Sequence, residues 1–282
     1  MARAGRHERS GGVRSLERGL ALLVAMNRRK LASVMELARD TRLPRPTVYR
    51  LLETLRQAGF VAHGCSTDRY QLARQVRTLS DGFADDAWIT EIASPLMAEF
   101  TRELVWPVAL MTFDEGEMLV RETTHQASSL SIDYGMVGRR LPMLRTAAGR
   151  AYLAFAPDNE RSAILDLLAQ SHQADDRHAQ DARRLNILIK AIRAKGYATQ
   201  DREINPRTTG IAVPIRVDDR VLGSISFIWI ASALTMEEAV QRFVQPLVLL
   251  AGRIAAAVRE ESALTAARGA AARERYRGTA TG

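Results

Sequence analysis

The chain has 282 residues, of which 46% are hydrophobic and 26% are charged, which is enough for two domains with ordinary cores. No apolar run approaches the roughly 18 residues of a membrane-spanning helix, and no secretory segment opens the chain. The single cysteine, Cys65, excludes an intramolecular disulfide. These features predict a cytoplasmic protein with no membrane segment.

Positive charge is concentrated in the first 80 residues. This stretch holds 16 Lys and Arg against 6 Asp and Glu, a net charge of +10, so the remainder of the +8 chain carries −2. A basic domain joined to a nearly neutral one is typical of proteins that bind polyanions, although a membrane surface or solubility alone could use the same asymmetry.

The first helix follows a basic, Gly-containing segment. Residues 1–12 show no periodicity, and we expect a disordered arm. Val13 to Met26 then predicts an amphipathic helix, with Leu16, Leu20, Leu23 and Val24 on one face.

The stretch from Ser33 to Arg56 predicts two short helices and a tight turn. Ser33 and Glu36 have the spacing of a capping box, and Thr41 to Pro44 should end the first helix. Pro46 suits the first turn of the second helix. Its apolar residues recur at helical spacing and should pack inward: Val48, Leu51, Leu52 and Leu55. Arg45, Thr47, Tyr49, Arg50 and Thr54 should then face outward, as in a helix that enters a DNA major groove. An ordinary helical hairpin with a solvated basic face remains the alternative.

A β-hairpin should follow this helix. Gly59 marks the helix end, and residues 60–63 and 69–72 form two short extended runs around a polar turn. Three helices and a hairpin make a winged helix–turn–helix, which we place at residues 13–80. Residues 81–104 should form a linker helix and the start of a second domain.

The second domain, residues 105–261, should be α+β, an antiparallel sheet with helices on it. The expected strands are Pro107 to Phe113, Glu117 to Thr123, Ser129 to Asp133, Ile211 to Val217 and Val221 to Ile230. The expected helices are Thr146 to Phe155, Asn159 to Ala169, Asp181 to Lys195 and one from Thr235 to about Glu261, followed by a frayed tail at 262–282.

Four segments together resemble the IclR family of bacterial transcription regulators. They are SLERGLALLVAM, LARDTRLPRPTVYRLLETLRQAGFV, VGRRLPMLRTAAGRAYLA and GYATQDREINPRTTGIAVPI with the following VLGSISF. The resemblance spans roughly residues 13–260 and implies a GAF-like effector domain, dimers or tetramers, and ligand-controlled binding to a palindromic operator. The chain departs from the family pattern at Arg150, where Lys is usual, and at Leu144-Arg145, where His and a small residue are common.

One segment, RETTHQASSLSIDYGMVGRRLPMLRTAAGRAYLAF, looks closest to regulators of aromatic-acid catabolism, particularly of 3-hydroxyphenylpropionate degradation. The resemblance therefore implies a small aromatic carboxylate as effector.

The residues expected at DNA fall in two groups. Bases should be contacted by Arg45, Thr47, Tyr49 and Arg50, and phosphates by Arg42, Arg56 and Arg69. For Arg69, an ordinary solvated hairpin charge is an equal alternative.

The resemblance also implies an effector pocket between the TAAG helix and the late strands. Its lining residues would be Leu130, Asp133, Leu141, Thr146, Ala147, Ala148, Gln200, Gly210, Ser226 and Ile228. The small residues at the helix start leave room for a ligand, the helix N-terminus attracts a carboxylate, and Arg145 could pair with it. Close helix–sheet packing and a surface Arg145 would explain the same residues.

Two other classes of function fit the sequence less well. A hydrolase could be drawn from Ser128, Ser129, Asp133 and His125, but the chain has no Gly-x-Ser-x-Gly elbow. A sensor acting only through protein contacts does not explain the basic N-terminal stretch. His125, His172 and His178 lack the spacing of a metal-ligand set, so no metal or other cofactor is expected.

Overall fold

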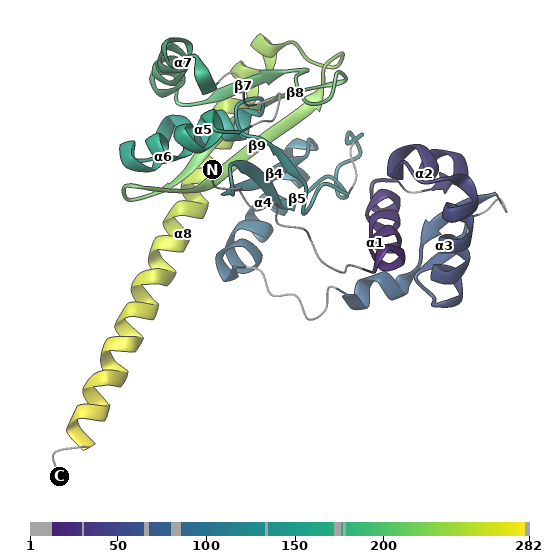
Figure 1. The fold of residues 1–282 in the computed structure, drawn as a ribbon. Coiled ribbons are helices and arrows are strands. Elements are labelled where there is room, and N and C mark those ends of the chain that lie inside the picture. Colours follow the sequence, from purple (N-terminus) through teal and green to yellow (C-terminus); the bar gives the residue numbers. More distant parts are fainter. Residues whose placement is uncertain are drawn as a thin grey trace, which may run out of the picture. The chain divides into compact units, whose positions relative to one another are not determined.

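The computed structural model describes residues 13–29, 31–64, 68–79, 86–132, 135–171, 176 and 179–279, with side chains described up to residue 264. The expected basic arm at residues 1–12 lies outside the described residues. The chain divides into two compact units, one holding the elements from α1 to η1 and the other those from η2 to α8 (Figure 1).

The N-terminal unit has the three helices and the hairpin that the sequence predicts. Its elements are α1 (Arg14–Asn27), β1 (Ala32–Ser33), α2 (Val34–Thr41), α3 (Arg45–Gln57), β2 (Val61–His63), β3 (Arg69–Leu72) and the 3₁₀ helix η1 (Arg74–Leu79). β2 and β3 pair antiparallel, with Val61 opposite Leu72. The two-residue strand β1 was not predicted; it pairs with β3 and completes a sheet of order β1-β3-β2.

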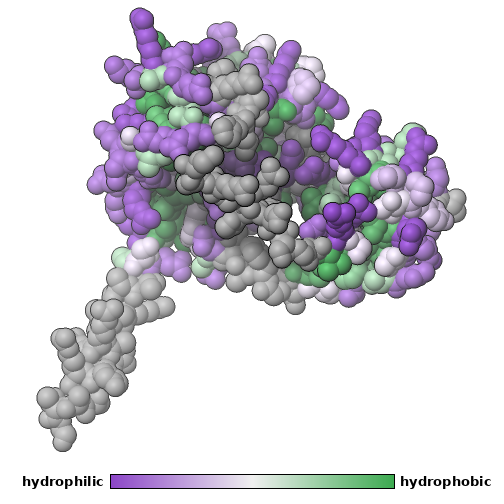
Figure 2. Space-filling view, in the orientation of Figure 1, coloured by the Kyte–Doolittle hydropathy of each residue, from purple (hydrophilic) through white to green (hydrophobic). Residues whose placement is uncertain are grey.

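The core of this unit corrects the predicted orientation of the first helix. α1 buries Leu22, Ala25 and Met26, whereas Leu16 and Leu20 of the expected apolar face are 61% and 52% exposed. α1 carries apolar residues on two faces, and helical periodicity alone does not decide which one packs inward. Hydrophobic side chains accordingly appear on the surface of this unit (Figure 2).

The second unit is a six-stranded antiparallel sheet with helices on both faces, so the predicted α+β class is confirmed. Its strands are β4 (Val108–Asp114), β5 (Glu117–Thr123), β6 (Arg140–Pro142), β7 (Ala198–Asp201), β8 (Thr208–Val217) and β9 (Arg220–Ile230), in the order β6-β5-β4-β9-β8-β7. Its helices are the π-helix η2 (Trp88–Ala93), α4 (Ser94–Leu104), α5 (Ala147–Phe155), α6 (Asp158–Ala169), α7 (Ala182–Lys195) and α8 (Met236–Thr279).

Alternation along the strands sends side chains into two separate cores. On β9, Ile225, Phe227 and Trp229 pack with α4 and α8, whereas Ser224 and Ser226 point to the face covered by α5. The core on that second face joins residues of α5, α6 and α7 to β4, β5 and β8. The space between the sheet and α5 therefore belongs to a different core from the one that α4 and α8 cover.

One predicted strand differs from the structure. Ser129 to Ile132 form turns and irregular backbone rather than a strand, and Asp133 lies outside the described residues. The Ser128 hydroxyl donates to the Val105 carbonyl (2.6 Å) and accepts the Leu130 N–H (3.2 Å), so a side chain satisfies main-chain groups that a strand would pair. The strand in this region is instead β6, which pairs with β5 through Leu141 and Met118.

The long helices were predicted with different ends. The helical structure before β4 is described from Trp88 to Leu104, so the expected start near residue 81 lies outside the described residues. α8 runs beyond the expected end near Glu261 to Thr279. Ala and Arg, the residues that fill this extension, have high helix propensity. Across the described residues, no helix has the length and apolar character needed to cross a bilayer.

Candidate functional sites

The start of α2 and the turn between α2 and α3 have the geometry that the sequence predicted. The Ser33 hydroxyl accepts the Glu36 N–H (3.3 Å), and the Glu36 carboxylate accepts the Ser33 N–H (2.8 Å), completing a capping box. The Ser33 N–H and the Ser33 hydroxyl (3.0 Å) both donate to the Glu36 carboxylate and so lower the pKa of Glu36. Arg42 ends α2 in the left-handed conformation with φ of 56°, and Pro46 lies in the first turn of α3. The local sequence therefore fixes how α3 leaves α2.

α3 buries one face and leaves a basic one exposed. Val48 and Leu52 are fully buried, whereas Tyr49 is 55% exposed. Arg45 and Arg50 are also exposed, and Thr47 is half-buried. Leu51 and Leu55, which we expected inside, are only half-buried and line a groove described below.

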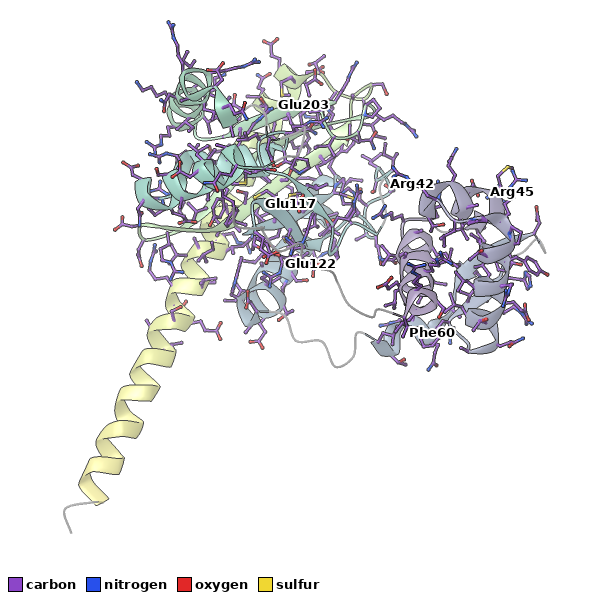
Figure 3. All side chains as sticks on the ribbon, viewed as in Figure 1. Arg42, Arg45, Phe60, Glu117, Glu122 and Glu203 are labelled. Atoms are coloured by element: carbon purple, nitrogen blue, oxygen red, sulfur yellow. The ribbon has the colours of Figure 1, made fainter. Side chains whose placement is uncertain are left out.

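The expected DNA-contacting arginines differ in whether they already have partners. Within the described part of the chain, the guanidinium groups of Arg42 and Arg50 have no hydrogen bond or ion pair, and that of Arg45 contacts the Met35 sulfur (3.4 Å). Figure 3 labels Arg42 at the end of α2 and Arg45 at the start of α3. Arg56 instead donates twice to the Glu53 carboxylate (3.0 and 2.7 Å). The phosphate role expected for Arg56 therefore requires exchange of this ion pair.

Arg69 lies apart from the turn that joins α2 and α3. It is the first residue of β3, is exposed, and stands opposite Ser33 of β1. The phosphate role expected for Arg69 stays a prediction.

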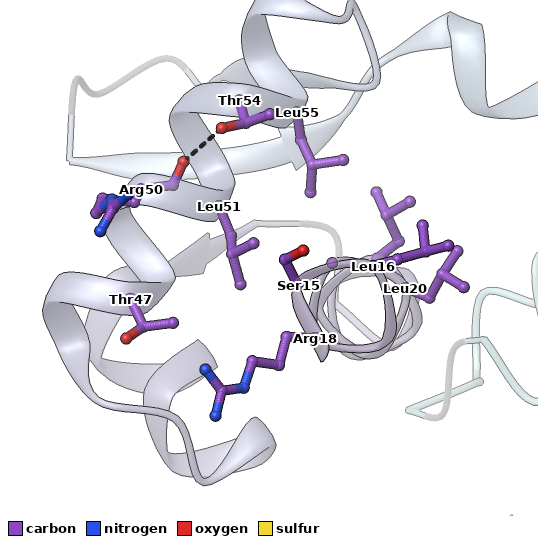
Figure 4. A pocket seen from close by; sticks show the side chains of 11 residues that line it. Ser15, Leu16, Arg18, Leu20, Thr47, Arg50, Leu51, Thr54 and Leu55 are labelled. Carbon is purple, nitrogen blue, oxygen red and sulfur yellow. Dashed lines mark hydrogen bonds between the residues drawn. The ribbon is translucent and has the colours of Figure 1, made fainter. Parts of the chain in front are cut away.

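A groove of about 580 Å³ lies between α1 and α3, and the sequence did not predict it. Leu16, Leu20 and Leu23 of α1 and Leu51 and Leu55 of α3 line its apolar part. Ser15, Arg18, Thr47, Arg50 and Thr54 line its polar part, and Figure 4 shows Arg18 extending toward Thr47. Arg18 has no ion pair with another described residue. It therefore adds a cation from α1 beside the residues expected to contact bases. The sequence did not indicate this role, because Arg18 lies on a different helix from the helix–turn–helix motif.

In the second unit, four of the expected effector residues lie at the start of α5: Arg145, Thr146, Ala147 and Ala148. Thr146 caps the helix by accepting the Gly149 N–H (3.0 Å), and Ala147 and Ala148 in the first turn are buried. The first turn of a helix leaves main-chain N–H groups without intrahelical partners, which favours an anion there.

The sheet contributes residues that face the same layer. Gln200 of β7 stands opposite Gly210 of β8, and Gly210 stands opposite Ile228 of β9. Ser226 follows in the same alternation, opposite Ala212. α5 packs on β7, β8 and β9, so these residues lie on the sheet face that α5 covers.

The remaining expected effector residues are more dispersed. Leu141 lies in β6, at the opposite edge of the sheet from Gln200, although its chain leads directly into α5. Leu130 is 37% exposed in the irregular segment after β5. Asp133 lies outside the described residues, so its expected role is not located.

A close main-chain contact explains why the TAAG motif has glycine at position 149. A Cβ built on Gly149 would lie 2.0 Å from the Met143 carbonyl oxygen, far inside van der Waals contact. The Ser224 hydroxyl of β9 also donates to the Ala148 carbonyl (2.9 Å). α5 is therefore held close both to the segment that precedes it and to the sheet.

Two arginines beside this helix are already engaged. Arg145 donates to the main-chain carbonyl of Glu203. Arg150 donates to the Leu144 carbonyl, the Thr199 carbonyl and the Glu203 carboxylate, at 2.7, 2.7 and 2.6 Å. Both side chains are half-buried and meet at the loop after β7. Arg150 and Glu203 were not expected at the site; a basic residue at the family's usual Lys position was the available signal for Arg150.

Among its residues that the structure describes, His125, Ser128 and Ser129, the hydrolase arrangement drawn from the sequence does not form. His125 is 2% exposed, and its Nδ1 lies 2.6 Å from the hydroxyl of Ser131, not of Ser128 or Ser129. The Ser128 hydroxyl is bonded to the Val105 carbonyl. Among the residues that the structure describes, no three His, Cys, Asp or Glu side chains form a group that could hold a metal ion.

Comparison with known proteins identifies both units. Residues 15–63 match the family described as the IclR helix-turn-helix domain, and residues 83–256 match the one described as Bacterial transcriptional regulator IclR C-terminal. The chain is 29% identical over 245 residues to the Pca regulon regulatory protein of Pseudomonas putida, covering 85% of this chain and 81% of the relative. It is 26% identical over 259 residues to the transcriptional regulator KdgR of Escherichia coli, covering 91% and 97%.

Solved structures share the fold. The Thermotoga maritima IclR structure has a TM-score of 0.58 at 20% identity and covers 86% of this chain and 98% of its own. An IclR homologue from Microbacterium hydrocarbonoxydans, crystallised with 4-hydroxybenzoate, has a TM-score of 0.55 at 21% identity and covers 87% and 99%.

Proposed function

The chain belongs to the IclR family of DNA-binding transcription regulators with an effector-binding domain, and from this premise we propose how it works. α3 binds operator DNA, and a small carboxylate bound beside α5 changes that binding. The observation that carries the DNA proposal is the outer face of α3, where Arg45, Tyr49 and Arg50 are exposed above the buried Val48 and Leu52.

The roles of the DNA-binding residues follow from their chemistry. Arg45 and Arg50 lie in the first two turns of α3 and can pair with guanine edges; Thr47 and Tyr49 contact bases or phosphates beside them. Arg42, Arg56 and Arg69 bind phosphates and fix the register of the helix. To these we add Arg18 of α1, which lines the groove between α1 and α3 together with Thr47 and Arg50.

The effector would lie between α5 and the sheet. Ala147 and Ala148 offer N–H groups and little bulk, while Gln200, Gly210, Ser226 and Ile228 line the opposing face. Leu130, Asp133 and Leu141 complete the proposed lining. Arg145, bound to the Glu203 carbonyl, would have to exchange that bond to meet a carboxylate.

We further propose that the effector is an aromatic acid and that the regulated genes serve its breakdown. The support is the segment from Arg121 to Phe155, which resembles regulators of aromatic-acid catabolism, together with the relative named for the Pca regulon. A regulator of this kind works in the cytoplasm, where the chromosome lies, as a homodimer or homotetramer.

The mechanism is a shift between two arrangements. The effector binds one of them more tightly, and that arrangement sets a different spacing of the DNA-binding units of the oligomer. The effector can change operator affinity only by its difference in affinity for the two arrangements.

A gel shift tests this proposal. The probes are the DNA upstream of the chain's own gene and of neighbouring operons, with and without 3-hydroxyphenylpropionate and 4-hydroxybenzoate. A specific shift that one acid changes supports both parts. A specific shift that no acid changes removes the aromatic effector and leaves the regulator.

A further inference from the structure

One residue of the loop after β7, Glu203, makes three polar contacts beside the proposed effector site. Its main-chain N–H donates to the Gln200 side-chain oxygen (3.1 Å), and its carbonyl accepts from Arg145. Its carboxylate accepts from Arg150 at 2.6 Å. Glu203 thus touches one expected effector residue of β7 and two arginines beside α5.

Arg150 is oriented independently of this carboxylate. Its Nε donates to the Leu144 carbonyl and its Nη1 to the Thr199 carbonyl, both at 2.7 Å. These acceptors belong to the main chain just before α5 and to β7, so they hold the guanidinium in place even without Glu203. The Nη2 group, which meets Glu203, would then be presented to any other carboxylate at the same position.

The ion pair is placed where such an exchange is feasible. The Arg150 side chain is 16% exposed and the Glu203 side chain 33% exposed, so the carboxylate lies on the solvent side of the pair. Loss of Glu203 alone would leave a mostly buried guanidinium one hydrogen bond short. Replacement of one carboxylate by another leaves the number of paired charges unchanged.

We propose that the Glu203 carboxylate is an internal competitor of the effector, and that an acid bound beside α5 takes its place on Arg150 and loosens the loop of residues 201–207. This inference rests on the proposed effector site. It assigns Arg150 as the cation that receives the carboxylate, and it makes the loop the segment that changes when the effector binds.

The loosening follows from how the loop is held. Arg202 has a left-handed backbone with φ of 55°, and the Asn205 side chain accepts the Arg207 N–H (3.0 Å) within the loop. These features shape the loop internally. Its hydrogen bonds to Arg145 and Arg150 run through Glu203, whereas Ile204 packs against the core that α5 shares with α6 and α7. Displacement of the Glu203 carboxylate therefore removes the ion pair that ties the loop to α5 and leaves the packing of Ile204 in place.

The test compares Glu203→Gln with a matched control, Glu99→Gln. Both variants remove one carboxylate from an Arg–Glu pair of the second unit, and Glu99 pairs with Arg253 on α4 and α8, on the other face of the sheet. Calorimetric titration of the full chain uses 3-hydroxyphenylpropionate, 4-hydroxybenzoate and the amide of the former. Because the internal competitor is weakened, Glu203→Gln should bind an acid about tenfold tighter than wild type, with no gain for the amide. Glu99→Gln should behave as wild type.

A second readout follows the loop itself. Arg202 and Arg207 are exposed trypsin sites in it, and the acid should speed cleavage there in wild type. In Glu203→Gln, cleavage should be fast without acid. Equal acid affinity in Glu203→Gln and wild type, an equal gain for the amide, or cleavage unaffected by acid would each overturn the inference.

Failure of this inference is distinguishable from failure of the proposed function. A wild-type chain that shifts its upstream DNA but binds none of the acids overturns the carboxylate competitor and leaves the regulator standing. Acid binding that Glu203→Gln strengthens, in a chain that shifts no DNA, has the opposite meaning.

Discussion

Substitution of Gly149 by alanine tests how closely α5 must approach the chain before it. The added Cβ would lie 2.0 Å from the Met143 carbonyl oxygen, whereas ordinary contacts begin at 3.4 Å, so the two main-chain segments would have to separate by about 1.4 Å. The gain in helix propensity from Gly to Ala is about 1 kcal/mol. Overpacking against a main chain that cannot rotate away costs about 3 kcal/mol. The expected net loss is about 2 kcal/mol.

Gly252 provides the matched control. It lies in α8, is exposed, and a Cβ there meets no atom within 4 Å. Gly252→Ala should therefore stabilise the second unit by about 1 kcal/mol through helix propensity alone.

Thermal unfolding monitored by circular dichroism separates the two variants. For a unit of this size, Gly149→Ala should lower the midpoint by roughly 4–8 °C and Gly252→Ala should raise it by roughly 2–4 °C. A Gly149→Ala variant as stable as wild type, beside a stabilised Gly252→Ala, would refute the close-approach argument.

Three further predictions concern the DNA-binding unit. Arg50→Ala should lose sequence-specific operator binding by about 1–3 kcal/mol in gel shifts while keeping its circular dichroism spectrum; unchanged operator affinity would remove Arg50 from the base-contacting set. Arg18→Ala should weaken specific and nonspecific DNA alike and reduce the slope of log K against log salt by about 1, and an unchanged slope would show that Arg18 contacts no phosphate. Ser33→Ala should destabilise the unit by about 1 kcal/mol in urea unfolding. Because the cap lowers the pKa of Glu36, the stabilisation that the cap contributes is present above the ordinary Glu pKa and is lost as pH falls. A loss of unfolding free energy in Ser33→Ala that persists unchanged in acid would contradict this.

The sequence predicted those features whose causes are local. The capping box joins Ser33 and Glu36, three residues apart, and the outward arginines of α3 follow from one helical period. Long alternating runs on either side of a short turn predicted strands β8 and β9.

Features that depend on distant parts of the chain were missed or misplaced. α1 offers two apolar faces, and only packing against α2 and α3 selects Leu22 and Met26 for the core. β6 is three residues long and exists through its pairing with β5. The contact of Arg150 with Glu203 spans 53 residues, and no spacing rule connects them.

The central claim is that one chain couples operator binding by α3 to an acid bound beside α5. The most direct measurement is the affinity for upstream DNA at two salt concentrations, with and without 3-hydroxyphenylpropionate. We predict sequence-specific binding that weakens with salt and changes when the acid is present. Absence of specific binding at both salt concentrations would contradict the account.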